Sequence, residues 1–118
     1  MNDTNESIIL KTYNLLKLSI PILNNFPKSQ KFVLGDRIQC LISDILDKLI
    51  EAYYAPANEK RDLLNTTNVL LVKLRYYFRL CYDLGFIHSI KFGEFAAQIE
   101  EIGKMVDGWL KAIKNEKG

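Results

Sequence analysis

Apolar residues recur along most of the chain at the spacing of three and four residues that is typical of amphipathic α-helices. This pattern predicts helices from about Asn5 to Asn25, from about Ser29 to Tyr54, from Glu59 to Gly85 and from about Ser89 to Lys114. The short connections between them force neighbouring helices to run antiparallel. The sequence therefore predicts an all-α protein with a single domain over residues 1–118, an up-down-up-down antiparallel four-helix bundle.

The predicted second and fourth helices each carry one clear apolar face, which we expect to form the core. In the second helix this face consists of Leu34, Ile38, Leu41, Ile42, Ile45, Leu49 and Tyr53. In the fourth helix it consists of Phe92, Phe95, Ile99, Ile102, Val106, Trp109 and Ile113. Residues at these spacings lie one above the other on a helix, so each set can be buried together.

The predicted first and third helices are apolar on more than one side. The main stripe of the first helix is Ile9, Tyr13, Leu16, Ile20 and Leu23, and its second stripe is Ile8, Leu15, Ile22 and Phe26. In the third helix one broad face carries Leu70, Leu74, Tyr77, Cys81 and Leu84. This is more apolar surface than one four-helix core accepts. We therefore expect a closed homo-oligomer.

A basic and aromatic strip recurs at i, i+4, i+7 and i+11 on the opposite side of the third helix: Arg75, Arg79, Tyr82 and Phe86. Guanidinium groups beside aromatic rings suit contacts with phosphates and stacked bases, or the core of a protein interface. A second interpretation is that Arg79 only pairs with Asp83 on a solvated surface, an interaction worth ~0.3–0.5 kcal/mol. The sequence leaves both interpretations open.

An acidic stripe, formed by Asp44, Asp47 and Glu51, lies on the second helix opposite its core face. Carboxylate bundles that hold two metal ions use inward-facing Glu and Glu-x-x-His pairs, and the sequence contains no such pair. We interpret the stripe as solvated or partner-facing. Because the third helix carries the basic strip, we expect the acidic face of one subunit to meet the basic face of its neighbour.

Local signals indicate where the predicted helices begin and end. Pro27 disfavours helical geometry in the residue before it and so ends the first helix at Phe26. Asn58 and Ser89 are side chains that we expect to cap the third and fourth helices. Gly85 stands where a helix C-terminal glycine is expected.

The composition limits the classes of function. Hydrophobic residues make up 48% and charged residues 25% of the chain, which is typical of a globular domain. The net charge of +2 is far from the strongly basic balance of a typical nucleic-acid module. Two isolated cysteines suit a reducing compartment, and the sequence shows neither a secretory signal nor a long charge-free apolar run. We expect a cytoplasmic protein with no membrane segment.

Catalytic signals in the sequence are weak. His88 is the only histidine, and no partnered nucleophile is placed beside it. Gly103 and Gly108 do not form a phosphate-binding loop, which needs a strand-to-helix turn that ends in Lys followed by Ser or Thr. Because glycine weakens a helix interior, we expect a close packing contact at these two positions. The sequence predicts no enzyme activity, no metal site and no cofactor.

Four short motifs, in this order and spacing, resemble a known family. They are Phe26-Pro27, Phe32-x-Leu34-Gly35-Asp36-Arg37-Ile38, Leu74-Arg75-x-x-x-Arg79-Leu80 and Glu101-Ile102-Gly103-Lys104-Met105-x-x-Gly108-Trp109. They are similar to motifs of the accessory variability determinant (Avd) proteins of diversity-generating retroelements. Four-helix proteins encoded in intervening sequences of 23S ribosomal RNA share the Pro and the Leu-Gly-Asp start. Those proteins usually carry Ser-Ile-Pro-Ala-Asn-Ile-Ala-Glu-Gly in the second helix, where this chain has Cys40-Leu41-Ile42-Ser43-Asp44-Ile45-Leu46, so the retroelement branch fits better.

The resemblance implies a cyclic homopentamer that binds the retroelement reverse transcriptase and nucleic acid and has no catalytic activity of its own. Arg75 and Arg79 would then carry contacts to nucleic acid or polymerase. Family members active in mutagenic retrohoming tend to be strongly basic, whereas this chain carries +2, so we expect weak, salt-dependent binding of RNA or DNA. The alternative is a structural interaction protein of the intervening-sequence type, with no retroelement role.

Overall fold

The computed structural model describes the backbone of residues 3–117 and the side chains of residues 5–114. Its helical elements are α1 (Asp3–Asn24), α2 (Lys28–Gln30), the π-helical turn η1 (Lys31–Gly35), α3 (Asp36–Tyr54), α4 (Ala57–Asp83) and α5 (Ser89–Lys117). Residues 3–117 contain no strand. The prediction of an all-α protein is confirmed. The predicted second helix is divided, because α2 and η1 precede α3.

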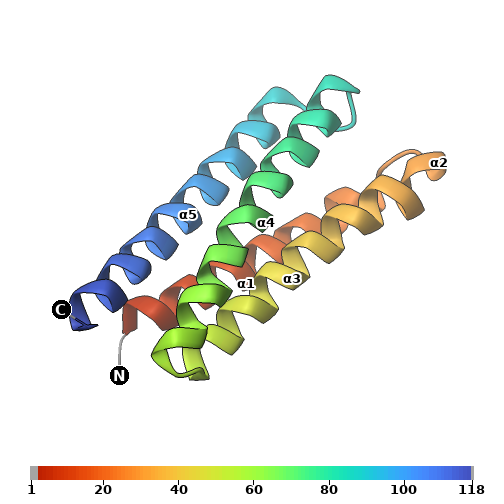
Figure 1. The fold of residues 1–118 in the computed structure, drawn as a ribbon. Helices are drawn as coiled ribbons and strands as arrows, with labels where there is room; N and C mark the ends of the chain where they lie inside the picture. The colour runs from red at the N-terminus through yellow and green to blue at the C-terminus, as the bar shows by residue number, and fades with distance from the viewer. Residues whose placement is uncertain (1–2, 118) are drawn as a thin grey trace.

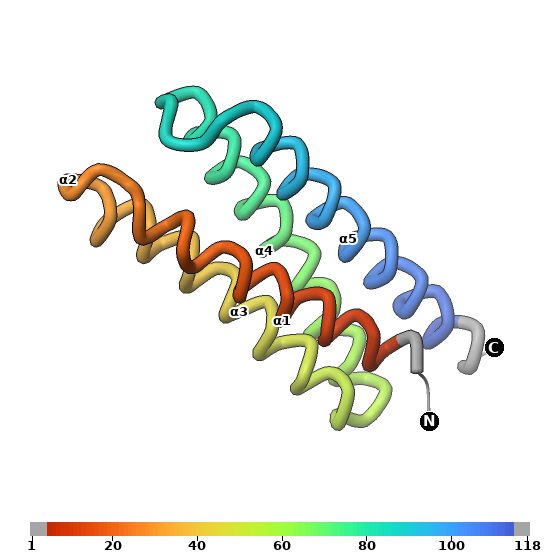
Figure 2. The backbone as a smooth tube through the Cα atoms, turned by 180° about the vertical axis from the view of Figure 1, so that it is seen from behind, coloured from red at the N-terminus to blue at the C-terminus, as the bar shows by residue number. Residues whose placement is uncertain are grey.

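The four long helices form an elongated bundle of 50 × 23 × 20 Å, in which α2 and η1 join α1 to α3 (Figure 1). α1 packs against α3 and α5, and α4 packs against the same two helices. Consecutive long helices run in opposite directions, as Figure 2 shows from behind. This confirms the up-down-up-down antiparallel four-helix bundle. None of the described helices combines the length and the apolar character that a membrane crossing requires.

The core takes side chains from all four long helices. The predicted core faces of the second and fourth helices are buried, with Tyr53 and Phe92 packed at the margin. Where α4 meets α5, the rings of Phe78 and Phe95 stack with their centroids 4.5 Å apart. Burying a large apolar side chain contributes roughly 1.5–3 kcal/mol. This shared interior therefore holds the helices together.

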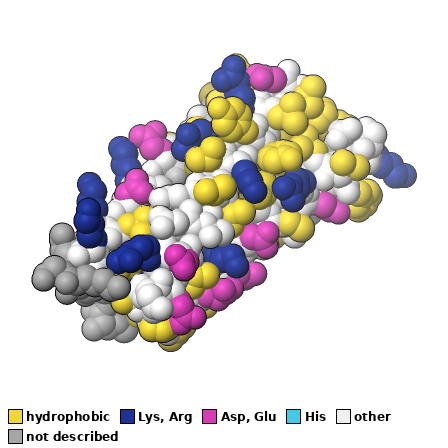
Figure 3. Space-filling view, in the orientation of Figure 1, with side chains coloured by type: hydrophobic (Ala, Val, Ile, Leu, Met, Phe, Trp, Pro, Cys, Tyr) yellow, Lys and Arg dark blue, Asp and Glu magenta, His cyan; other side chains and the backbone are white. Residues whose placement is uncertain are grey.

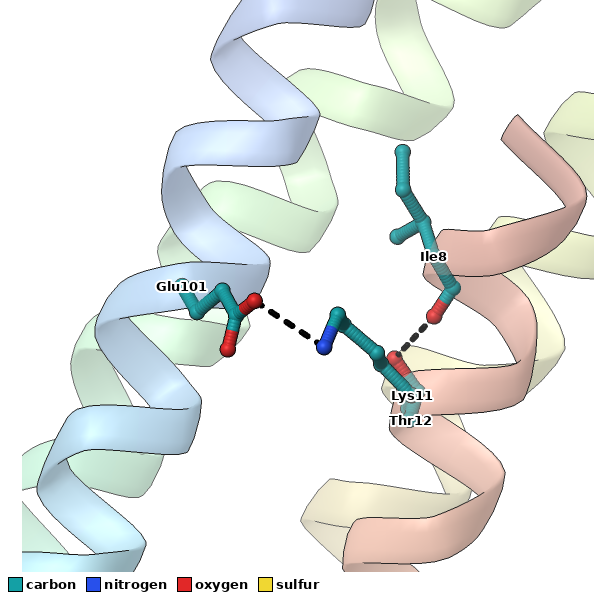
Figure 4. Close-up of polar contacts among 4 residues, drawn as sticks. All are labelled: Ile8, Lys11, Thr12 and Glu101. Carbon is teal, nitrogen blue, oxygen red and sulfur yellow. Dashed lines mark hydrogen bonds and ion pairs between the residues drawn. The ribbon is translucent and has the colours of Figure 1, made fainter. Parts of the chain in front are cut away.

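In α1 the structure reverses the roles of the two predicted stripes. The buried side of the helix consists of Ile8, Thr12, Leu15, Ser19 and Leu23. The Thr12 hydroxyl donates a hydrogen bond to the carbonyl of Ile8 at 3.0 Å, drawn in Figure 4, and the Ser19 hydroxyl donates to that of Leu15 at 2.7 Å. Both hydroxyls are thus satisfied without water, which allows their burial. Of the stripe that we predicted as the main one, only Leu23 is fully buried, and Tyr13 is exposed.

In α4 the buried face also differs from the prediction. It consists of Leu64, Thr67, Leu71, Leu74, Phe78 and Cys81. Leu71 and Phe78 take the central places that we assigned to Leu70 and Tyr77, which are half-buried beside them. The prediction was wrong at Leu84, which lies beyond the end of α4 and is 54% exposed. Because Leu70 and Leu71, and likewise Tyr77 and Phe78, are adjacent apolar residues, the sequence does not show which member of each pair lies at the centre of the core face.

A backbone motif ends α4 at the position that the sequence predicted. Gly85 has a φ of 80°, a left-handed conformation that strains residues with a Cβ. The Gly85 amide donates to the carbonyl of Tyr82 at 3.0 Å, and the Phe86 amide donates to that of Cys81 at 2.8 Å. These are the two hydrogen bonds of a Schellman motif. The prediction of a C-terminal glycine at Gly85 is confirmed.

The predicted helix caps lie inside their helices. α4 begins directly after Pro56, which places Asn58 in its first turn, and no side-chain hydrogen bond caps this end. Pro56 has an extended ψ of 160°, which makes it the residue at which the chain turns into the helix. Ser89 is itself the first residue of α5. The assignment of Asn58 as a cap was therefore wrong by two positions.

Long-range polar contacts join the helices around the core. At the end of α3, the Lys60 ammonium donates to the carbonyls of Ala52 and Tyr53 at 2.8 and 3.1 Å, in the last turn, where carbonyls lack the usual amide partner four residues on. The Ala52 carbonyl also accepts from the Ala55 amide at 3.4 Å. Halfway along the bundle, Lys11 of α1 and Glu101 of α5 form an ion pair of 2.9 Å (Figure 4). Because this pair is partly exposed, it adds little to the stability of the fold.

Replacement by alanine should have opposite effects on stability at Gly85, which follows the end of α4, and at Gly108, which lies inside α5. Gly85→Ala should lower the free energy of unfolding by about 1–2 kcal/mol, because alanine is strained at this positive φ. Gly108→Ala should raise it by up to about 1 kcal/mol, because Gly108 is exposed in a helix and an added Cβ meets nothing within 4 Å. The same open space surrounds Gly103, so the expectation of a close packing contact at Gly103 and Gly108 was wrong. Urea unfolding of both variants at one protein concentration measures the two effects, and effects of the same sign would contradict the prediction.

Candidate interaction surface

The basic strip lies on the flank of α4 beside α5. Arg75 and Arg79 are exposed and border a hollow of about 280 Å³, whose other lining residues are Tyr76, Phe92 and Ala96. The strip therefore does not lie opposite the core face, as we predicted from the sequence, but about a quarter-turn from it. The reason is the shift in the centre of the core face toward Leu71 and Phe78.

The two aromatic residues of the strip differ in their exposure. Tyr82 is 40% exposed and stacks on Phe92 of α5, with ring centroids 4.9 Å apart and an interplanar angle of 16°. Phe86 is half-buried against the core, and its ring lies 5.4 Å from that of Phe26. The structure thus keeps Arg75, Arg79 and Tyr82 together on the surface and places Phe86 mainly in the packing between the two hairpins.

The two arginines also differ in their electrostatic surroundings. The Arg79 guanidinium donates to the Asp83 carboxylate at 3.1 Å, the pair that we considered as the second interpretation from the sequence. Arg75 has no ion pair among the described residues. Because an exposed pair is weak, Arg79 can exchange Asp83 for another anion at little cost. Arg75 is the arginine of the strip that can bind an anion without breaking an ion pair within the chain.

An apolar stripe on the outer face of α4 was not singled out by the sequence analysis. This α4 stripe consists of Val69, Val72, Tyr76 and Leu80, which are 55%, 43%, 71% and 42% exposed. Figure 3 shows hydrophobic side chains over the α4 side of the molecule, with Lys and Arg among them. Steps of three, four and four residues place the stripe on one side of the helix. That spacing was the available signal, but the apolar residues on the neighbouring faces obscured it.

A second apolar surface is the groove between α1 and α3. This α1/α3 groove has a volume of about 720 Å³, and its lining residues are Glu6, Ser7, Ile9, Leu10, Tyr13, Leu46 and Ile50. Leu10 and Tyr13 are 57% and 50% exposed. Ile9 and Tyr13 belong to the stripe that we expected in the core. The apolar pattern of the first helix was therefore detected, but its role in the bundle was not.

The acidic stripe is exposed on α3, as expected from its position. Glu51 lies 3.9 Å from Lys48, whereas Asp44 and Asp47 have no ion pair among the described residues. The acidic stripe and the basic strip lie on different helices, and no hydrogen bond or ion pair joins them among the described residues. Residues 3–117 contain no group of three or more His, Cys, Asp and Glu side chains that could hold a metal ion.

The cysteines and the histidine have separate environments. Burial raises the pKa of the Cys81 thiol to about 12, because the interior disfavours the charged thiolate. Cys40 is exposed on α3, and His88 is exposed in the turn before α5. A thiol with so high a pKa is a poor nucleophile at neutral pH. Among the described residues, the side chains suited to contacts with another molecule are those of the basic strip, the acidic stripe, the α4 stripe and the α1/α3 groove.

The fold places the chain in the class of all-α four-helix-bundle proteins. A family model described as bAvd-like matches residues 7–113, and the chain belongs to this family. The match covers nearly the whole chain and confirms the resemblance to the Avd family that the four motifs indicated. Neither the curated proteins nor the solved structures gave a match.

The two cysteines predict a selective labelling pattern. At pH 8, iodoacetamide should modify Cys40 and leave Cys81 unmodified, because Cys81 is buried and almost fully protonated well below a pKa of about 12. In urea both thiols should react. Intact-mass spectrometry counts the modified thiols, and a Cys40→Ser variant that is labelled in the folded state would contradict the buried position of Cys81.

Proposed function

We propose that this chain, as an Avd-type accessory protein, assembles into a homopentamer and binds a retroelement reverse transcriptase together with nucleic acid during mutagenic retrohoming. In this proposal it assists the polymerase in copying template RNA into variable cDNA and catalyses no step itself. Membership of the bAvd-like family supports the accessory role. The partners and the assembly are the part that experiment must test.

The observation that carries the proposal is the surface on which apolar and basic groups meet. Arg75 and Arg79 border the hollow that Phe92 and Ala96 of α5 also line, and Tyr82 stacks on Phe92, so the flank of α4 that faces α5 offers guanidinium groups beside aromatic and apolar area. Arginine and tyrosine are enriched in the centres of protein interfaces. Guanidinium groups also bind phosphates through paired hydrogen bonds. This surface suits a polymerase that is itself bound to nucleic acid.

The net charge sets the expected strength of nucleic-acid binding. With a charge of +2 per chain, each protomer offers few phosphate contacts, so a single protomer binds weakly and without sequence preference. A ring repeats the Arg75 and Arg79 pair once per subunit. Repetition on one rigid assembly raises the overall affinity through effective concentration. We therefore assign nucleic-acid binding to the oligomer.

The near-neutral charge also favours a second candidate function. A structural interaction protein of the intervening-sequence type would need the bundle and its exposed surfaces, but neither a polymerase nor an RNA ligand. The two candidates differ in one observable property. Only the accessory protein co-purifies with the reverse transcriptase of its own retroelement.

Co-expression with a tagged reverse transcriptase of the same retroelement tests the proposal. The wild-type chain should be retained, and Arg75→Ala/Arg79→Ala should reduce its retention at least tenfold. Lys111→Ala/Lys114→Ala removes the same charge from an exposed part of α5 and serves as the control. Fluorescence anisotropy with RNA and DNA at about 50 and 200 mM salt should show loss of binding at the higher salt. Absence of the polymerase from the purified complex would favour the second candidate.

Sedimentation equilibrium at micromolar concentration tests the assembly. We expect a closed species with five times the mass of one chain, because the α4 stripe and the α1/α3 groove leave large apolar side chains exposed on the isolated protomer. Proteins rarely leave extensive apolar patches in water. A species with the mass of a single chain at every concentration would exclude the ring.

A further inference from the structure

Two apolar surfaces lie on different elements of the same chain, and their shapes differ. The α1/α3 groove is a hollow of about 720 Å³. The α4 stripe is a row of side chains on the outer face of a helix, with Tyr76 71% exposed at its centre. A helix that lays its apolar side chains into a groove between two other helices is a common mode of protein recognition. The α4 stripe is thus the kind of helical surface that a groove such as the α1/α3 groove accepts.

The charges beside the two surfaces are opposite in sign. At the groove, Glu6 of α1 is one of the lining residues, and Asp47 of α3 follows the lining residue Leu46; both are exposed, and neither has an ion pair among the described residues. Next to the α4 stripe, Lys73 is exposed and also has no ion pair among those residues. Apposition of the two surfaces would bring carboxylates toward a cation that the single chain leaves apart. Such complementarity favours one pairing of surfaces over others.

We propose that the α4 stripe of one copy docks into the α1/α3 groove of a second copy. Tyr76 fills the hollow beside Leu10 and Tyr13, and the flanking charges set the orientation. The inference rests on the proposed homo-oligomer and identifies the two surfaces that form its contact. It differs from the expectation derived from the sequence, in which the acidic face of one subunit met the basic face of its neighbour. Here the apolar contact supplies the affinity, and the charges select the register.

The use of two different surfaces makes the contact heterologous. Each copy then offers one stripe and one groove, and each interface leaves a free stripe at one end and a free groove at the other. Copies add in one direction until the rotation between them closes a ring. A two-fold dimer, in which the same surface meets itself, would instead leave the other surface uncovered. The arrangement therefore predicts a specific behaviour of mixtures.

The test uses one variant for each surface. Leu10→Glu/Tyr13→Glu blocks the groove, and Val69→Glu/Tyr76→Glu blocks the α4 stripe. All four positions are about half exposed or more, so the fold should be retained, which circular dichroism checks. Each variant alone should be monomeric, with a dissociation constant for self-association raised at least a hundredfold. A mixture of the two should form a dimer and nothing larger. The groove variant retains its α4 stripe and the stripe variant retains its groove, so only one contact can form.

A matched control places the same charges elsewhere. Leu18→Glu/Ile90→Glu changes two side chains that are 54% and 80% exposed but belong to neither surface. This variant should assemble like the wild type in sedimentation velocity. If it also dissociates, added negative charge alone explains the effect and the inference fails.

The remaining outcomes also decide the inference. Assembly of either single-surface variant alone, or a mixture that stays monomeric while both variants are folded, would overturn the pairing of stripe with groove. A monomeric wild type would overturn it as well. Co-purification of the reverse transcriptase with the wild type is a separate measurement. A ring that depends on both surfaces but retains no polymerase would leave the pairing intact and reject the proposed function.

Discussion

The fold depends on a geometric constraint: a helix in a four-helix bundle can bury only one broad side against its neighbours. In this chain α3 and α5 meet that constraint with a single apolar face each, but α1 and α4 carry apolar residues over a wider arc. The core therefore selects one side of each helix, and the remaining apolar residues are left at the surface. The α1/α3 groove and the α4 stripe both arise in this way.

Which side of each helix faces the core explains how much of the structure could be predicted from the sequence. The number and direction of the long helices and the C-terminal glycine followed from periodicity and turn chemistry. The core faces of α3 and α5 could be predicted because each of these helices carries only one apolar face. In α1 the sequence could not reveal that Thr12 and Ser19 are satisfied by their own backbone, so hydrophobicity pointed to the wrong side. The sequence placed Arg75, Arg79 and Tyr82 on one strip, but it put that strip opposite the core face, because the centre of the core face depends on packing between helices, which a helical wheel of one helix does not include.

The charged groups are arranged so that the chain satisfies only some of them. Lys11 with Glu101, and Arg79 with Asp83, form pairs within the chain. Asp44, Asp47 and Arg75 have no such pair among the described residues. Exposed charges of this kind contribute little to the stability of a fold. Their effect lies in the rate and the orientation with which another molecule approaches, so the near-neutral total conceals a surface with distinct acidic and basic parts.

The contact of Lys60 with the end of α3 gives the two ends of the bundle different chemistry. At the α4–α5 end, the turn is closed by backbone bonds around Gly85, which no modification of a side chain can remove. At the α3–α4 end, one ammonium binds the carbonyls of Ala52 and Tyr53 and lies 6.0 Å from the Trp109 ring of α5. Acetylation of this lysine would remove its charge and the cation–π contact. Loss of that one charge would therefore weaken the α3–α4 end, whereas the α4–α5 end is held by the main chain.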